Sequence, residues 1–176
     1  MPQLIPEPVR DTRRSNDPLD GDFLEQIAKC SKRTRDSRLT RINHALQVAV
    51  PQLQDLELMS DERSVPHLQG RYMQWRPNTG RQTEEHFSDG TLRLLGLLWA
   101  FLAGSAPLLH EEPELSLHAG VVRLIPSMIV KAGGRGGRQI LVTTHSEEQL
   151  SGQGIATEEV LILTPRKDGT EAGLGC

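Results

Sequence analysis

Aromatic residues, cysteines and long apolar runs are all scarce in this sequence. Three Phe, two Trp and one Tyr are the aromatic residues among 176, which leaves few rings on which nucleic-acid bases could stack. Cys30 and Cys176 are the two cysteines, so a disulfide framework is excluded and we expect a cytoplasmic protein with reduced thiols. No apolar run is long enough to span a membrane, and the start, MPQLIPEPVRDTRR, lacks the apolar core of a signal peptide. We therefore expect no membrane partner.

An excess of charge of one sign is also missing. The chain has 20 basic and 23 acidic residues, a net charge of −3, so no overall attraction to nucleic acid or to an anionic membrane follows. With 36% apolar residues, a chain of this length forms one domain with a real core. Its function must therefore be argued from local motifs.

Composition divides the chain into three parts. Residues 1–21 carry four prolines and scattered charge, which predicts an extended, weakly ordered segment. Residues 22–86 form a predicted middle region with a helix and a β-hairpin. Residues 87–176 alternate helix and strand in the rhythm of a parallel α/β sheet.

The middle region begins with a predicted helix over residues 22–49, which Pro51 ends. Two strands, LQDLELMSD and HLQGRYMQWRP, are expected to pair antiparallel around ERSVP, followed by a polar loop, NTGRQTEE. The buried face of the helix is predicted to hold Phe23, Leu24, Ile27, Leu39, Ile42, Leu46 and Val50. A basic run within it comprises Lys32, Arg33, Arg35, Arg38 and Arg41. A solvated helix face explains this run better than a nucleic-acid contact, because few aromatics accompany it.

The stretch HFSDGTLRLLGLLWAFLAG predicts a capped and deeply buried helix. Ser88, Asp89 and Gly90 are suited to its first turn, and the leucines that follow cover several faces, with Leu95, Trp99 and Leu102 expected in the core. The free N–H groups of such a helix start also suit a phosphate. A plain helix cap is the simpler explanation of these three residues when they are taken alone.

The stretch PLLHEEPELSLHAG places an acidic cluster after a short strand. Crowded carboxylates repel one another unless a cation or a proton lies between them. Pro113 cannot continue a strand ladder, so the glutamates lie at its carboxyl end, where α/β sheets bind ligands. Because neighbouring strand side chains point to opposite faces, Glu111 and Glu112 are expected to differ in role, one near Mg²⁺ and the other facing an attacking water. A solvated acidic turn is the structural alternative, and His110 is expected to be a core histidine.

The stretch RQILVTTHSEEQL predicts a second buried strand, Ile140 to Val142, that delivers Thr143, Thr144 and His145 to its carboxyl end. Ser146 would cap a short helix, with Gln149 completing a capping box, so His145 would be fixed between strand and helix. A final strand, EEVLILTPRKDGT, is expected to end in a turn at residues 167–169.

Together, FSDGTLRLL, LLHEEPELSLH and ILVTTHS resemble the second half of an ABC-type ATPase core. The likeness is to SMC/RecF/OLD-like ATPases of the AAA_21 type, where these stretches are the signature motif, the Walker B strand with its D-loop, and the switch-histidine strand. It is close over residues 87 to about 165, and RINHALQVAVPQLQDLEL extends it toward residue 9. The resemblance implies a P-loop NTPase-like fold: a mostly parallel sheet flanked by helices, with a helical and antiparallel β segment before it.

The resemblance also implies roles, cofactors and partners. With Mg²⁺ and ATP as cofactors, Glu111 would be the Walker B acid near the metal, Glu112 the general base and His145 the switch residue. The signature would contact the ATP of a partner protomer in a head-to-tail dimer. DNA or an effector protein is a further compatible partner. The signature comprises Ser88, Asp89 and Gly90, and the D-loop comprises Leu115, Ser116, Leu117 and His118. Glu at position 111 replaces the usual Asp, and His110 replaces an aliphatic residue.

One family motif is missing from these 176 residues. No G-x-x-x-x-G-K-[ST] occurs; AGGRGGRQ (132–139) is Gly-rich but precedes a strand, whereas a P-loop follows one. We expect it to connect a helix with a strand, an RGG-like contact with RNA being the lesser alternative. The expectation is therefore a C-terminal portion of a longer ATPase, whose P-loop lobe lies elsewhere.

Three functional classes follow from these motifs. The first is a Mg²⁺-dependent ATPase, and the second a non-hydrolytic regulatory or assembly subunit that donates a signature surface. The third is a metal-dependent nuclease that uses Glu111, Glu112, Glu114 and His118, which would leave the signature and switch motifs without a purpose. DNA repair, phage defence and toxin control are all compatible with this ATPase type.

Overall fold

The computed structural model describes residues 23–73, 80–115, 117–133 and 138–175. The expected extended segment 1–21 and Ser116 lie outside the described residues. In chain order the elements are α1 (Phe23–Lys29), α2 (Lys32–Leu46), β1 (Leu53–Ser60), β2 (Pro66–Tyr72), β3 (Arg81–Thr83), the 3₁₀ turn η1 (Glu84–His86), α3 (Asp89–Leu102), β4 (Leu108–Glu111), α4 (Ala119–Val122), α5 (Ile125–Gly133), β5 (Ile140–Thr143), α6 (Glu147–Leu150), the 3₁₀ turn η2 (Thr157–Glu159), β6 (Leu161–Arg166) and β7 (Gly169–Leu174).

The single helix predicted over residues 22–49 is two helices. Ser31 lies between α1 and α2, and its hydroxyl accepts a hydrogen bond from the Thr34 amide at 3.3 Å, so α2 has its own N-cap. The expected buried face is confirmed for all its members except Leu24, which is half-buried. Two residues of the basic run make contacts within the chain. Lys32 forms an ion pair with Asp36 at 2.7 Å, and the Arg38 guanidinium lies over the Trp99 ring. These contacts favour the structural interpretation of the run.

The middle region ends in a three-stranded antiparallel sheet of order β1-β2-β3. The pairing of β1 with β2 is as predicted, but part of the stretch expected to be a polar loop forms β3 and pairs with β2 from Gln69↔Thr83 to Arg71↔Arg81. A Cβ at Gly70 in β2 would lie 2.6 Å from Leu53 Cδ1, so a larger residue there would force the buried Leu53 side chain to shift. This close approach packs the strands over the core.

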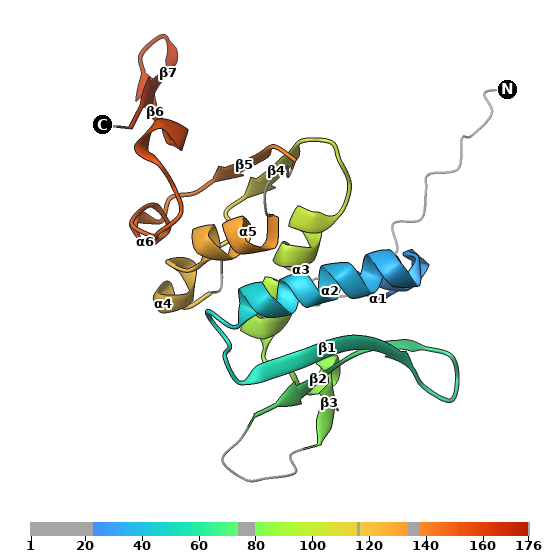
Figure 1. The fold of residues 1–176 in the computed structure, drawn as a ribbon. Helices are drawn as coiled ribbons and strands as arrows, with labels where there is room; N and C mark the ends of the chain where they lie inside the picture. The colour runs from blue at the N-terminus through green and yellow to red at the C-terminus, as the bar shows by residue number, and fades with distance from the viewer. Residues whose placement is uncertain (1–22, 74–79, 116, 134–137, 176) are drawn as a thin grey trace, which may run out of the picture.

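Helix α2 lies between this sheet and the C-terminal part of the chain, and it packs against β1, α3 and α5 (Figure 1). Helix α3 is buried on several sides, as its leucines predicted, with Leu95 1% and Trp99 3% exposed, while Leu102 is half-buried. The Phe23 ring meets the Trp99 ring edge-on at 6.3 Å. No helix in the described ranges combines the length and apolar character needed to cross a bilayer.

The carboxyl end of α3 is held by Arg138, which comes from the Gly-rich segment. Its guanidinium donates to the carbonyl of Ala103 and, at 2.5 Å, to that of Ala100. These are carbonyls that a helix end leaves without partners. Arg138 therefore has a structural role and is not a free RNA contact, while residues 134–137 of the segment lie outside the described residues.

The parallel sheet is smaller than predicted. Within the described ranges it consists of β4 and β5, which pair parallel from Leu108↔Ile140 to Glu111↔Thr143. The expected last strand, β6, does not join them but forms a separate antiparallel hairpin with β7 through a turn at Lys167 and Asp168; this hairpin extends from the body (Figure 1). The expected mostly parallel sheet was therefore wrong for these residues, because alternating helix and strand patterns do not fix which strands pair.

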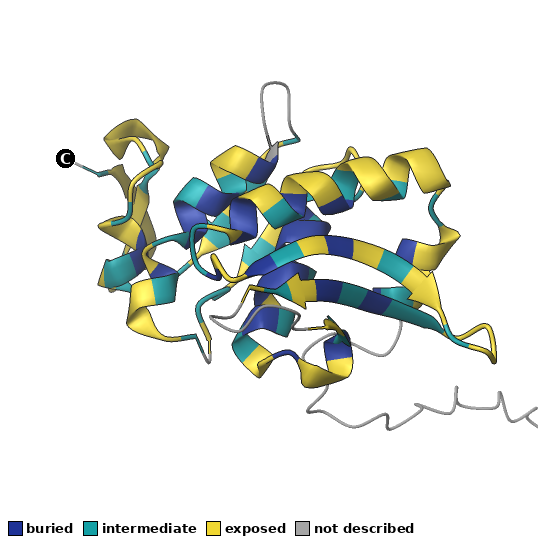
Figure 2. Ribbon diagram, turned by 60° about the horizontal axis from the view of Figure 1, so that its bottom comes forward, coloured by how far each residue is buried: buried dark blue, intermediate teal, exposed yellow. Residues whose placement is uncertain are grey.

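One face of the parallel pair is packed and the other is bare. Leu108 and Ile140 pack against the core cluster, whereas Leu109 and Leu141, on the opposite face, are 76% and 43% exposed. Figure 2 shows how the buried positions concentrate between the helices and the antiparallel sheet. Parallel sheets in proteins are usually covered on both faces, so this bare apolar face is unusual. The expectation that β5 is a buried strand is wrong, because Leu141 and Thr143 are exposed on this face.

Replacing Leu95 by Ala should lower the free energy of unfolding by about 2–5 kcal/mol, because the side chain is buried and its removal leaves a cavity in the core. Urea unfolding followed by circular dichroism measures this loss. Leu109→Ala is the matched control on an exposed leucine and should cost less than about 1 kcal/mol. Equal losses for the two variants would contradict the placement of α3 in the core.

Candidate functional site

The carboxyl ends of β4 and β5 meet at one edge, because the two strands run parallel and in register. Glu111 is the last residue of β4, and its side chain is exposed. The next residue, Glu112, leaves the strand: its amide still donates to the Thr143 carbonyl at 2.9 Å, but its φ is 43°. That left-handed conformation costs about 1–3 kcal/mol for a residue other than glycine. Glu111 is therefore exposed and Glu112 half-buried, but they differ because Glu112 leaves the strand, and not through the alternation along a strand that the sequence suggested. Their different roles stay a prediction.

Glu112 and His145 are brought together across this edge. His145 Nε2 lies 3.4 Å from Glu112 Oε1, and the side chains are 91% and 35% exposed. The residues come from the loops after β4 and β5, which are far apart in sequence. At this separation the two side chains form an ion pair when the imidazole is protonated.

A hydrogen-bond network beneath His145 holds its loop in place. The Thr144 hydroxyl donates to Glu114 Oε1, the His145 amide donates to the same oxygen at 3.3 Å, and the Ser146 amide donates to Thr144 Oγ1 at 2.9 Å. Ser146 caps α6 as predicted, by accepting from the Gln149 amide at 3.3 Å. The expected capping box is wrong, because the Ser146 amide is already bonded to Thr144 and the buried Gln149 Oε1 has no partner.

His110 is a half-buried histidine of the core, as predicted. Its ring meets that of Phe101 edge-on at 6.2 Å. Burial lowers the pKa of His110 below 6.5, and the nearby Glu114 carboxylate partly opposes this. A neutral imidazole therefore packs behind the loop that follows β4 and holds Glu112 and Glu114, which we call the acidic loop.

The predicted signature and D-loop residues share a pocket. Ser88 is the N-cap of α3, and its hydroxyl accepts from the Thr91 amide at 3.3 Å. Ser88 and Gly90 line a pocket of about 390 Å³ together with Leu117 and His118. A Cβ on Gly90 would meet Leu117 Cδ2 at 3.8 Å, so the helix start is open toward the D-loop. A helix N-terminus facing such a pocket suits an anionic ligand.

The remaining predicted residues lie around these two places. Asp89 is the first residue of α3 and is exposed, and Leu115 is 58% exposed. His118 caps α4 by accepting from the Gly120 amide at 3.1 Å. Ser116 lies outside the described residues.

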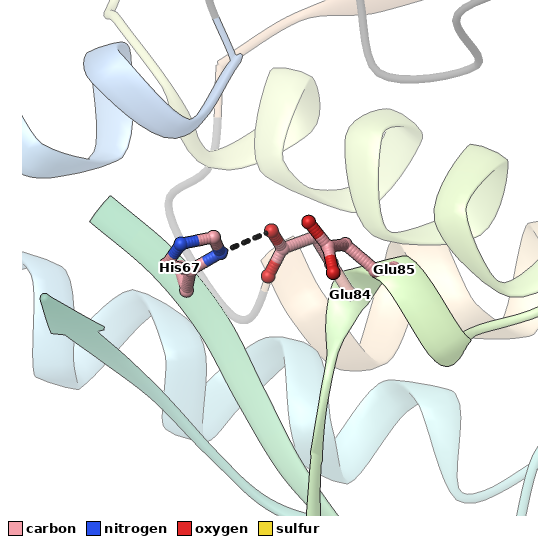
Figure 3. A group of neighbouring side chains, drawn as sticks. All are labelled: His67, Glu84 and Glu85. Carbon is pink, nitrogen blue, oxygen red and sulfur yellow. Dashed lines mark hydrogen bonds and ion pairs between the residues drawn. The ribbon is translucent and has the colours of Figure 1, made fainter. Parts of the chain in front are cut away.

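The group of side chains best placed for a metal is elsewhere. In the described part of the chain, the group of three or more candidate ligands whose atoms all lie within 4.8 Å is His67, Glu84 and Glu85 (Figure 3). The nuclease alternative required Glu111, Glu112, Glu114 and His118 to converge, and they form no such group. Sequence reasoning missed the His67–Glu84 pair, because 17 positions separate the two residues and no periodic pattern links them.

Glu84 already has partners for both of its carboxylate oxygens. Oε1 lies 2.8 Å from His67 Nδ1, and Oε2 accepts from the Leu68 amide at 2.7 Å. The side chain is buried, so these bonds offset the loss of hydration that a buried carboxylate suffers. Glu84 therefore joins η1 to β2 through His67 and Leu68, shortly before the chain enters α3.

The model of the AAA_21 family, described as "AAA domain, putative AbiEii toxin, Type IV TA system", matches residues 7–151. The match includes the three stretches that carried the resemblance. No curated protein matches the chain.

Solved structures of SMC ATPase heads share the fold. One, from "Structural biochemistry of ATP-driven dimerization and DNA stimulated activation of SMC ATPases", is 11% identical, with a TM-score of 0.57 and 88% of each chain covered. A second, the SmcHead bound to the C-winged helix domain of ScpA, is 14% identical, with a TM-score of 0.59 over 90% of this chain and 51% of that chain. A third is the Smc head domain with an extended coiled coil, bound to the C-terminal domain of ScpA, from Pyrococcus furiosus. It is 12% identical, with a TM-score of 0.56 over 87% of this chain and 38% of that chain.

These similarities support the fold and not an activity, because the identities are so low. The chain spans about half of the second structure's chain and less than that of the third. The resemblance stated from the sequence is thus confirmed for the family and for the fold of an SMC-like head.

The stability of the chain should fall as the pH rises above 6.5, because of His67. Its hydrogen bond to Glu84 raises the pKa of His67 above 6.5, so the folded chain holds this proton more tightly than the unfolded chain. The stabilisation is full below pH 6.5 and is lost as the pH rises through the folded pKa. Urea midpoints measured from pH 5 to pH 9 should show this fall, and His67→Gln should remove it.

His110 supplies an internal control for the same measurement. Because burial lowers its pKa, its effect lies below pH 6.5, where stability should fall with falling pH in both proteins. A His67→Gln chain with an unchanged slope above pH 6.5 would contradict the tie to Glu84.

Proposed function

The chain belongs to the AAA_21 family of AAA domains, and on that premise we propose that it is the signature-bearing and Walker B-bearing part of an SMC-like ATPase that hydrolyses Mg²⁺–ATP in a head-to-tail dimer. One observation carries the proposal: Glu112 and His145, from loops after two parallel strands, lie 3.4 Å apart at the edge of the sheet. A carboxylate and an imidazole side by side at that edge can accept a proton from an attacking water and orient it toward a phosphoryl group.

The two neighbouring glutamates have different roles in this proposal. The exposed Glu111 carboxylate at the strand end would hold Mg²⁺, which prefers one or two carboxylates together with phosphate and water oxygens. When bound, the metal neutralises charge on the phosphates. Glu112, whose carboxylate lies beside His145, accepts the proton of the attacking water. His145 orients that water or the terminal phosphate.

The signature of one protomer would serve the nucleotide of the other. Ser88, Gly90 and Thr91 at the start of α3 line a pocket of about 390 Å³ that Leu117 and His118 also line. Gly90 leaves room for close approach of a phosphate. In this proposal a partner protomer completes the surface around the nucleotide.

The phosphate cradle would come from outside these 176 residues, since they contain no G-x-x-x-x-G-K-[ST]. The bare face of the β4–β5 pair suits the arrival of such a lobe, because Leu109 and Leu141 expose apolar surface there. Burying these two side chains against a P-loop-bearing lobe would cover the parallel pair on both faces.

The second candidate is a subunit that donates its signature without hydrolysing ATP. The missing cradle motif favours it for this chain on its own. The two candidates differ in whether Glu112 matters: a donor subunit needs Ser88 and Gly90 but not a general base.

In a complex that supplies a P-loop lobe, Glu112→Gln should lower ATP turnover by roughly 10²-fold or more, because the amide keeps the size of the side chain but cannot take a proton. ATP binding and dimerisation should persist. Glu111→Gln should instead weaken Mg²⁺ binding, so that activity falls at low Mg²⁺ and recovers as Mg²⁺ is raised. Steady-state turnover over a Mg²⁺ series compares the two variants directly.

Residues 1–176 alone are the control and should bind ATP weakly with negligible turnover. Identical defects in turnover and Mg²⁺ dependence in the two glutamine variants would contradict the separate metal and base roles. Full activity of the Glu112→Gln complex would instead favour the donor subunit.

A further inference from the structure

Glu114 connects three segments of the proposed site, yet the family resemblance gives it no role. It follows the two glutamates in the acidic loop, and its Oε1 accepts from the Thr144 hydroxyl and from the His145 amide. Its own carbonyl accepts from the Leu117 amide at 2.9 Å. One residue therefore binds the acidic loop to both the His145 loop and the D-loop.

The His145 ring has little else to fix its position. It is 91% exposed, and the contact with Glu112 at 3.4 Å is the ion pair found for it among the described residues. The position of the ring therefore depends on the backbone turn 144–146. Thr144 is the centre of that turn, since its hydroxyl donates to Glu114 and accepts from the Ser146 amide at 2.9 Å.

The second oxygen of Glu114 distinguishes this carboxylate from an ordinary surface residue. Oε2 is buried and has no hydrogen-bond partner, which is unfavourable for a carboxylate. An aspartate would be too short for the same reach, and an amide would keep the Oε1 acceptor while being cheaper to bury. The geometry requires an acceptor at Oε1, and the negative charge is not what makes the bonds.

We propose that Glu114 is a positioning residue of the ATPase site: by accepting from Thr144 and His145, it holds the His145 loop against the acidic loop so that His145 faces Glu112. This inference rests on the proposed function for its catalytic meaning. Its structural part stands on the hydrogen bonds alone. Four variants test the hydrogen bond between Thr144 and Glu114. Glu114→Ala and Thr144→Val remove this bond, whereas Glu114→Gln and Thr144→Ser keep it. Two measurements on these variants separate the structural part from the catalytic part.

The first arm of the test measures amide hydrogen exchange in the chain itself by NMR. In Glu114→Ala and Thr144→Val, the amides of His145 and Ser146 should exchange about tenfold faster, because their acceptors are lost or displaced. Glu114→Gln and Thr144→Ser should stay within about twofold of the original chain. The amides of α5 serve as the internal reference. If Glu114→Ala does not fold, the isosteric Thr144→Val gives the same comparison. Unchanged exchange in the bond-removing variants would overturn the proposal.

The second arm measures ATP turnover in the complex that supplies a P-loop lobe. The bond-removing variants should lower kcat about tenfold with little change in the KM for ATP, because they misplace a group used in the chemical step. The bond-keeping variants should restore kcat. Equal kcat in all four variants would overturn the positioning role. A complex of the original chain without any turnover would instead refute the proposed function, while the exchange data would still decide whether Glu114 holds the turn.

Discussion

The parallel pairing of β4 with β5 is the interaction on which the candidate site depends. Because Glu111 lies opposite Thr143 in this register, both strands end at one edge, and the loops that follow them must meet. The Glu112 amide still bonds to Thr143 while its φ is already left-handed, so the last ladder bond and the turn are formed by the same residue. A slip of one residue would move Glu112 to the other face and separate it from His145.

The core behind this edge gives the pairing its support. Leu108 and Ile140 pack against the core cluster, His110 lies against Phe101 of α3, and Arg138 ties the end of α3 to the start of β5. The other face of the pair remains open at Leu109 and Leu141. The β4–β5 pair thus has one packed face and one exposed apolar face suited to a further lobe, and the candidate site lies at the edge where both strands end.

Local patterns predicted what is locally determined. Helix α3, its Ser88 cap, the Ser146 cap and the existence of β4 and β5 follow from apolar spacing and capping residues near one another in sequence. Strand β5 continues one residue beyond its predicted end at Val142. What the sequence could not indicate depends on distant partners. The three residues of β3 form a strand by pairing with β2. The Ser146 amide bonds to Thr144, whose hydroxyl is held by Glu114, and is therefore not available for the predicted capping box. Strand β6 pairs with β7, although its apolar run equally suits a parallel strand. The AAA_21 family could be identified because its motifs are short and lie in loops.

The central claim is that one active site takes its base from one protomer and its signature from the other. Gly90→Asp adds a carboxylate at the signature, where a Cβ meets Leu117 at an ordinary 3.8 Å, and Glu112→Gln removes the base. In the complex with its P-loop lobe, each variant alone should be inactive. An equal mixture should regain roughly a quarter of the original ATP turnover, because half of the dimers are mixed and each has one intact site of two. A mixture as inactive as either variant would show that the signature and the base act within the same protomer, and would contradict the account.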